Sequence, residues 1–156
     1  MTTTPADTVY EVIPMVHVAD VEASIAFYAL LGFSVRDKVQ HAGKTQWAWI
    51  TSGRGHLMLT AASGPVDPRQ QAVLFYLYCE NIAMMRAHLL ANGLADGGAF
   101  GHCEEGREPS TDEAARRSGC RTVFEISHPF YMPEGELRVH DPDGYCLLIG
   151  QCAIQT

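Results

Sequence analysis

The sequence lacks the features that would place it in a membrane or secreted class. No apolar run is long enough to cross a bilayer, and residues 1–7 are not typical of a secretory signal peptide. The five cysteines are odd in number and include no Cys-x-x-Cys pair. We therefore expect a cytoplasmic protein with reduced thiols and no membrane partner.

Common catalytic and nucleic-acid motifs are also missing. There is no Gly-rich phosphate loop, no nucleophile elbow, no ordered set of Ser, His and Asp, and no basic stripe. The net charge of −7 argues against a nucleic-acid partner and mildly favours a neutral or cationic ligand. With 156 residues, of which 47% are apolar and 19% charged, the chain fits one folded domain.

The most informative feature that is present is an internal repeat. Asp20 recurs 61 positions later as Asn81, and Gly32 recurs at the same spacing as Gly93. Asp and Asn are good residues to begin a helix, and Gly is a good residue to end one. Because the repeat occurs only twice, it indicates a duplicated structural unit and not a solenoid.

Each copy of the repeat predicts one strand, one helix and then further strands. Module one, about residues 11–62, predicts a strand at 11–18, a helix at 21–31, and strands at 33–39, 45–50 and 57–61. Module two, about residues 72–152, predicts a helix at 82–91 and strands at 122–127, 136–140 and 145–150. A polar, Gly-rich insertion at about 95–121 interrupts it, and a capping box at 110–113 predicts a short surface helix there.

The motifs that frame these elements resemble the vicinal oxygen chelate superfamily, which includes glyoxalase I, extradiol dioxygenases, and the fosfomycin- and bleomycin-resistance proteins. The matching segments are residues 13–20, 24–28, 31–33 and 135–144, with Phe27-Tyr28, Leu31-Gly32-Phe33 and Asp141-Pro142-Asp143-Gly144 as their signatures. The chain is most similar to the bleomycin-resistance branch. The resemblance implies an α+β fold over residues 1–156, in which two tandem βαβββ modules form a curved mixed sheet with a cleft, usually in a homodimer.

The same resemblance locates the positions where most enzymes of the superfamily bind a divalent metal, on the first and last strand of each module. In this sequence those positions are Ile13, Leu59, Leu74 and Leu148. None of these side chains has a lone pair, whereas such a site needs at least three nitrogen or oxygen donors. We therefore expect no bound metal and no cofactor, and an absence of catalysis is favoured.

The favoured hypothesis is a metal-free protein that sequesters a hydrophobic or cationic small molecule, such as an antibiotic. Strand alternation places aromatic and polar side chains on shared faces that would suit such a ligand. The candidate ligand-binding residues are Met15, His17, Trp47, Trp49, Tyr76, Tyr78, His128, Tyr131 and Glu136. Ordinary core or dimer packing explains paired Trp and Tyr residues equally well, since aromatic residues favour strands whatever the function.

Two catalytic alternatives stay open. A metal-dependent lyase, isomerase or dioxygenase would need ligands that are not at the inherited positions, and His17, His128, His140 and Glu136 are the available set. A metal-free catalyst would use His17 as general base. A further mixed cluster at residues 102–105 combines His, Cys and Glu, but a loop rarely holds such groups in a preset geometry.

Overall fold

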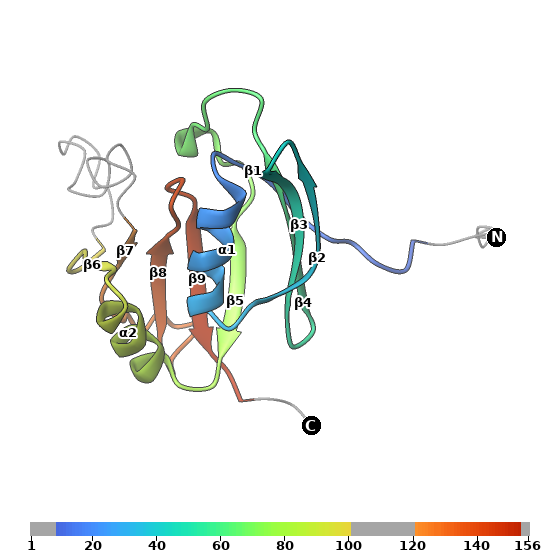
Figure 1. The fold of residues 1–156 in the computed structure, drawn as a ribbon. Coiled ribbons are helices and arrows are strands. Elements are labelled where there is room, and N and C mark those ends of the chain that lie inside the picture. Colours follow the sequence, from blue (N-terminus) through green and yellow to red (C-terminus); the bar gives the residue numbers. More distant parts are fainter. Residues whose placement is uncertain (1–8, 101–120, 154–156) are drawn as a thin grey trace, which may run out of the picture.

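The computed structural model describes residues 9–100 and 121–153, and the short helix expected from the capping box at 110–113 lies outside them. Module one contains β1 (Met15–Val18), α1 (Val21–Leu30), β2 (Ser34–His41), β3 (Lys44–Ser52) and β4 (Gly55–Ala61) (Figure 1). Its strands form a sheet in the order β1-β4-β3-β2, which we call the first sheet. β1 runs parallel to β4, and the other neighbours are antiparallel.

Module two repeats this plan and adds a short edge strand. After a short 3-10 helix, η1 (Pro68–Gln70), come β5 (Phe75–Cys79), α2 (Ile82–Ala91), β6 (Ala95–Asp96), β7 (Thr122–Val123), β8 (Glu136–His140) and β9 (Cys146–Gln151). These strands form the second sheet, in the order β5-β9-β8-β7-β6, with β5 parallel to β9. The structure therefore confirms an α+β fold of two tandem modules, each with its own mixed sheet.

The helix ends explain why the repeat is visible in the sequence. A side-chain oxygen of Asp20 accepts a hydrogen bond from the Ala23 N–H, and Asn81 does the same for Met84. Gly32 and Gly93 follow the two helices with φ angles of +92° and +90°, a conformation that side chains with a Cβ rarely adopt. The repeated residues are thus the ones that start and stop the helices.

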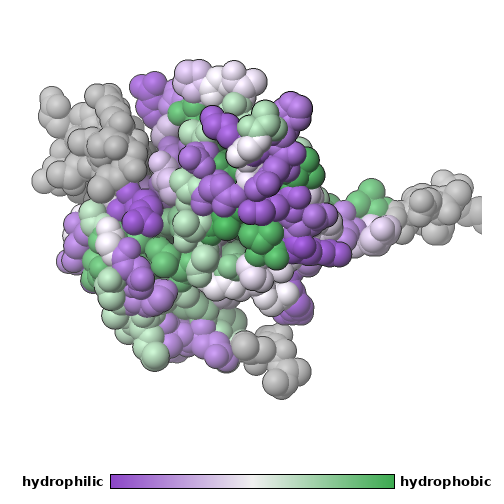
Figure 2. All heavy atoms as spheres, in the orientation of Figure 1, coloured by the Kyte–Doolittle hydropathy of each residue, from purple (hydrophilic) through white to green (hydrophobic). Residues whose placement is uncertain are grey.

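Each sheet buries one face against its own helix. In the first sheet, Ala48, Ile50 and Leu57 are buried beneath α1, and in the second sheet alternate residues of β8 and β9 pack against α2. No helix of the described residues packs on the opposite face of either sheet. The edge strand β2 is exposed along its whole length, and Figure 2 shows hydrophilic residues over it.

The turn from Asp141 to Tyr145 links the two modules. Asp143 accepts a hydrogen bond from the Ala19 N–H at 2.9 Å, and the Tyr145 hydroxyl donates to the His17 carbonyl at 2.8 Å. The Tyr28 hydroxyl of α1 donates to the Asp141 carboxyl at 3.4 Å. α1 therefore lies on the side of the first sheet that faces module two. Neither helix of the described residues is long and apolar enough to cross a membrane.

Candidate functional site

The uncovered face of the first sheet carries both tryptophans of the chain. Strand register places Met15, Met58 and Trp49 in one row across β1, β4 and β3. The next row holds His17, Thr60 and Trp47. We call these six residues the Trp face. Alternation in β3 predicted that the two tryptophans share a face, and the burial of Ala48 and Ile50 on the other side agrees with it.

Trp49 is held on this face by two neighbours that the sequence analysis did not identify. The Arg36 guanidinium lies 4.1 Å from the centre of the Trp49 ring, and the indole N–H donates to His56 Nδ1 at 3.1 Å. The register of β2 shifts between Val35 and Asp37, so Arg36 is the extra residue of a bulge. A bulge redirects a side chain, and here it turns Arg36 over the indole.

The uncovered face of the second sheet is built around a buried carboxylate. Glu136 is only 3% exposed, and its two oxygens accept hydrogen bonds from the hydroxyls of Tyr76, at 2.6 Å, and Tyr131, at 3.2 Å. The Tyr76 and Tyr78 rings lie 5.2 Å apart on β5. We call Tyr76, Tyr78, Glu136, Arg138 and Leu148 the Tyr face.

The two hydroxyls remain protonated donors because their surroundings disfavour ionisation. Burial, followed by the hydrogen bond to Glu136 and its charge, raises the pKa of Tyr76. Loss of solvent and then the Glu136 charge also raise the pKa of Tyr131. Both phenols can therefore donate to the carboxylate throughout the physiological pH range.

A glycine makes room for this arrangement. Gly150 of β9 lies directly opposite Glu136 in the sheet. A Cβ at this position would lie 2.9 Å from both the Tyr76 hydroxyl and the end of the Met132 side chain. The absence of a side chain at Gly150 thus allows Tyr76 to reach across β9 to the carboxylate.

A cavity of about 360 Å³ opens beside Glu136. It is lined by residues of β8 and by residues 99–100 and 125–131. Its walls include Phe100, Ile126, His128, Tyr131, Glu136 and Arg138. The structure therefore brings Tyr76, His128, Tyr131 and Glu136 of the predicted set together.

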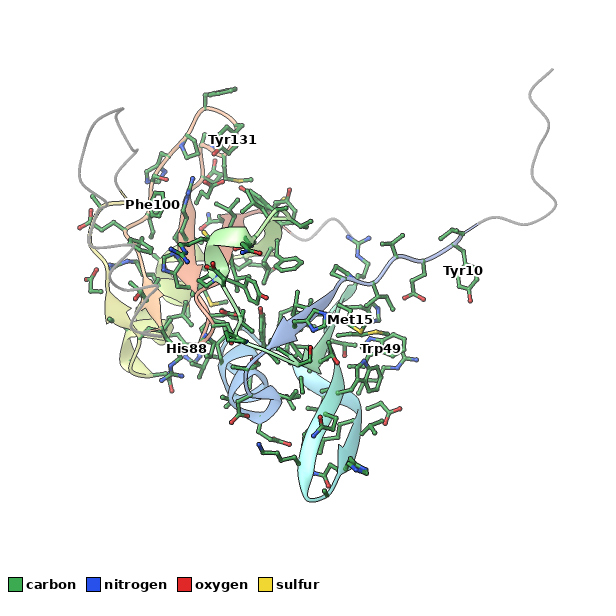
Figure 3. All side chains as sticks on the ribbon, turned by 90° about the horizontal axis from the view of Figure 1, so that it is seen from above. Tyr10, Met15, Trp49, His88, Phe100 and Tyr131 are labelled. Carbon is green, nitrogen blue, oxygen red and sulfur yellow. The ribbon has the colours of Figure 1, made fainter. Side chains whose placement is uncertain are left out.

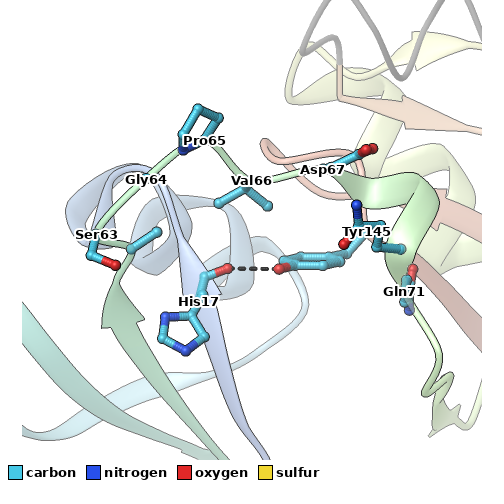
Figure 4. Close-up of a pocket in the computed structure, with 10 residues that line it drawn as sticks. His17, Ser63, Gly64, Pro65, Val66, Asp67, Gln71 and Tyr145 are labelled. Carbon is cyan, nitrogen blue, oxygen red and sulfur yellow. Dashed lines mark hydrogen bonds between the residues drawn. The ribbon is translucent and has the colours of Figure 1, made fainter.

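Tyr78 lies beside Tyr76 on the Tyr face, and the predicted residues of the first sheet lie elsewhere. In Figure 3, Met15 and Trp49 lie on one side of the chain, and Tyr131 and Phe100 lie on another. His17 borders a separate, shallow hollow of about 420 Å³ at the module junction, together with Tyr145 and the linker of residues 62–71 (Figure 4). The Trp face belongs to the first sheet and the Tyr face to the second.

One of the four inherited metal positions was assigned incorrectly. Register pairs Met15 with Met58 and its repeat counterpart Tyr76 with Leu148, so the counterpart of Leu148 is Met58. Leu59 is 0% exposed and belongs to the core beneath α1. The error arose because the two loops before β4 and β9 differ in length, so equal counts from Gly55 and Gly144 reach opposite faces.

The corrected set, Ile13, Met58, Leu74 and Leu148, offers a single thioether and no nitrogen or oxygen. These residues do not fit a divalent metal of the kind that the superfamily binds. The described residues also contain no group of three or more His, Cys, Asp and Glu placed to hold an ion. Of the proposed substitutes, His140 is fully buried against the Phe124 ring, while His17 and His128 border different hollows. The cluster at 102–105 lies outside the described residues.

Solved structures of antibiotic-binding proteins have a similar fold. A bleomycin-binding protein complexed with bleomycin is 18% identical, with a TM-score of 0.60, and the match covers 93% of this chain and 100% of that one. The bleomycin-binding protein of bleomycin-producing Streptomyces verticillus, complexed with copper(II)-bleomycin, is 14% identical, with a TM-score of 0.61 and coverage of 94% and 99%. TnmS3, an antibiotic-binding protein from Streptomyces sp. CB03234, is 12% identical, with a TM-score of 0.56 and coverage of 94% and 100%.

At these identities the likeness shows a shared fold alone. No curated protein matches the chain in sequence. The sequence pattern of the glyoxalase/bleomycin resistance protein/dioxygenase superfamily matches residues 13–148, which is most of the chain. The protein belongs to the glyoxalase/bleomycin resistance protein/dioxygenase superfamily.

Proposed function

We propose that this protein captures a small organic molecule, such as an antibiotic, and releases it chemically unchanged. The observation that carries the proposal is the composition of the two uncovered sheet faces. Tryptophan, tyrosine and methionine side chains surround a few polar groups there, which is the composition of a typical ligand-binding cleft. Structural relatives named as bleomycin-binding and antibiotic-binding proteins support the same conclusion.

The proposal includes a second copy of the chain. The Trp face and the Tyr face belong to different sheets. In Figure 3, Met15 and Trp49 of the Trp face lie on one side of the chain, and Tyr131, whose hydroxyl donates to Glu136, lies on another. Met15 of the Trp face and Tyr78 of the Tyr face are each more than half exposed, and exposed apolar side chains are available for contact with a partner. A homodimer that sets the Trp face of one copy against the Tyr face of its partner would enclose the ligand between them.

Capture would depend on stacking and charge, with no covalent step. Trp47, Trp49 and Met15 would cover the flat parts of the ligand from one side, and Tyr76 and Tyr78 would do so from the other. Glu136, with His128 and Tyr131 beside it, would hold the polar end. No residue of the proposed site needs a metal for this role, and none of the observed clusters favours a catalytic function over binding.

Tryptophan fluorescence tests the proposal directly, because both tryptophans of the chain lie on the Trp face. We would titrate the protein with bleomycin and a panel of cationic and aromatic antibiotics, with and without added divalent metal. A ligand should quench or shift the emission and raise the melting temperature, with no requirement for metal. Light scattering on the same samples should give the mass of a dimer.

Substitutions of the two tryptophans test whether the Trp face binds the ligand. Trp47→Ala and Trp49→Ala should each weaken binding by about tenfold or more, as aromatic anchors do. Met84→Ala is a matched control, since Met84 is an exposed apolar residue of α2 that lies away from both faces. Unchanged binding in both tryptophan variants would count against the Trp face. Stoichiometric zinc, nickel, manganese or iron in protein purified without chelator would favour the enzyme alternative.

A further inference from the structure

The cavity beside Glu136 contains two opposite charges that do not pair with each other. Glu136 and Arg138 are two residues apart on β8, so their side chains leave the same face of the strand. Neither takes part in any of the ion pairs of the described residues. Both line the same cavity. The usual outcome for neighbouring opposite charges, a salt bridge, is not formed here.

Each charge is held apart by its own aromatic partners. The two tyrosine hydroxyls hold the Glu136 carboxylate, while the Arg138 guanidinium lies 3.9 Å from the centre of the Phe100 ring. Phenols and a ring face compensate a buried charge only in part, since neither supplies a full opposite charge. The cavity therefore contains a nearly buried anion and a half-buried cation that a ligand could contact.

From this arrangement we infer that the cavity binds a zwitterionic group of the amino-acid type, with its ammonium on Glu136 and its carboxylate on Arg138. A ligand with only a positive charge would meet repulsion from Arg138, and one with only a negative charge would meet it from Glu136. An α-amino acid group satisfies both and gains two charge-assisted hydrogen-bonded contacts. The apolar walls formed by Phe100, Ile126 and Tyr131 suit an aromatic or aliphatic side chain. This inference rests on the proposed function, because it names the chemical class that the same pocket recognises.

Three commercially available molecules test the inference, because they share a phenylethyl group and differ only in which charged groups they carry. L-phenylalanine carries both charges, phenethylamine lacks the carboxylate, and 3-phenylpropanoate lacks the ammonium. Calorimetry or ligand-observed NMR on the full chain should show L-phenylalanine binding at least about tenfold more tightly than either analogue, the value expected for one charged hydrogen-bonded contact. Equal binding of phenethylamine and L-phenylalanine would overturn the inference. So would the absence of L-phenylalanine binding up to about 10 mM.

Two variants assign each charge to its residue. Glu136→Gln should remove the advantage of L-phenylalanine over 3-phenylpropanoate, and Arg138→Met should remove its advantage over phenethylamine. Glu125→Gln is the matched control, because Glu125 is a carboxylate on the wall of the same cavity but is exposed to solvent. Circular dichroism and melting temperature establish that each variant folds. If Glu136→Gln does not fold, binding of the three ligands to the unmodified protein and to Arg138→Met still tests the inference.

The outcome also separates this inference from the proposed function. If an antibiotic changes the tryptophan emission and protects the protein from melting while L-phenylalanine does not bind, the zwitterion class is wrong and the capture function stands. If neither the antibiotic panel nor L-phenylalanine binds, both are wrong.

Discussion

Asp141 is a carboxyl group with no exposure to solvent, so substituting it tests how burial of an ionisable group affects the stability of the fold. Burial raises its pKa to about 7, against the lowering effect of hydrogen bonds from the backbone N–H groups of Tyr145 and Asp143. The nearest charged group on the same turn is Asp143, which adds repulsion. Within the part of the chain that the structure describes, no cation is among the groups that shift this pKa, so the folded protein resists ionisation of Asp141.

The effect on stability follows from linkage between protonation and folding. An Asp in the unfolded chain has a pKa near 3.8, so between this pH and about 7 the folded state binds the proton that the unfolded state releases. The contribution of Asp141 to stability is therefore complete below pH 3.8 and is lost as pH rises through about 7. At about 1.4 kcal/mol per pH unit, the loss amounts to roughly 4 kcal/mol.

The variant Asp141→Asn removes the ionisation and keeps the shape. Its amide oxygen can still accept from the N–H groups of Asp143 and Tyr145, and its NH₂ group can donate to the Tyr28 hydroxyl. Relative to the unmodified protein, the variant should gain up to about 4 kcal/mol in free energy of unfolding at pH 8 and nearly nothing at pH 4. Urea denaturation at each pH from 4 to 8 measures the difference, and the contributions of the other carboxyl groups largely cancel in it.

A difference between the two proteins that is the same at pH 4 and pH 8, or that favours the unmodified protein at pH 8, would show that burial does not raise the pKa of Asp141. Asp143→Asn is the control. Asp143 is less buried, and although burial also raises its pKa, its side chain accepts a hydrogen bond from the Ala19 N–H. Its pH dependence should have the same sign and a smaller size.

Four further substitutions test the packing of the site and the core. Gly150→Ala should destabilise the fold by about 1–3 kcal/mol, through overpacking against Tyr76 and Met132, and should weaken ligand binding in the calorimetric titration. Tyr76→Phe should cost about 1 kcal/mol in urea denaturation, because a nearly buried carboxylate loses its shorter hydrogen bond, while Tyr131→Phe should have a smaller effect. Leu89→Ala should lower the free energy of unfolding by about 2–5 kcal/mol, since Leu89 is a fully buried residue of α2, and a loss below about 0.5 kcal/mol would contradict the packing described.

Local chemistry made the helices predictable from sequence. The helix expected at 82–91 is α2, Ile82–Ala91, because its capping residues fix both ends. The strand expected at 136–140 is β8, with the same bounds. The strand expected at 11–18 begins only at Met15. Pro14 precedes it and has no N–H to donate to a sheet, which explains the later start.

The faces of the strands were also predictable, but the pairing between strands was not. Alternation placed Tyr76 and Tyr78 on one face, and it would have placed Arg138 beside Glu136 had it been applied to β8. The hydrogen bond between Tyr76 and Glu136 joins residues 60 positions apart. It depends on β9 lying between β5 and β8, which period-two alternation does not specify.

Leu59 was assigned incorrectly because the pairing between strands could not be predicted. The observed pairing corrects this assignment. A count along one strand, starting from a turn, fails when two turns differ by a single residue, because the side chain then points to the other face. A count across two paired strands does not fail in this way. Met15 with Met58 and Tyr76 with Leu148 are equivalent pairs, since both first strands are parallel to the last strand of their module and the repeat relates Met15 to Tyr76. The internal repeat therefore determines which residues occupy the inherited metal positions, once the parallel pairing is known.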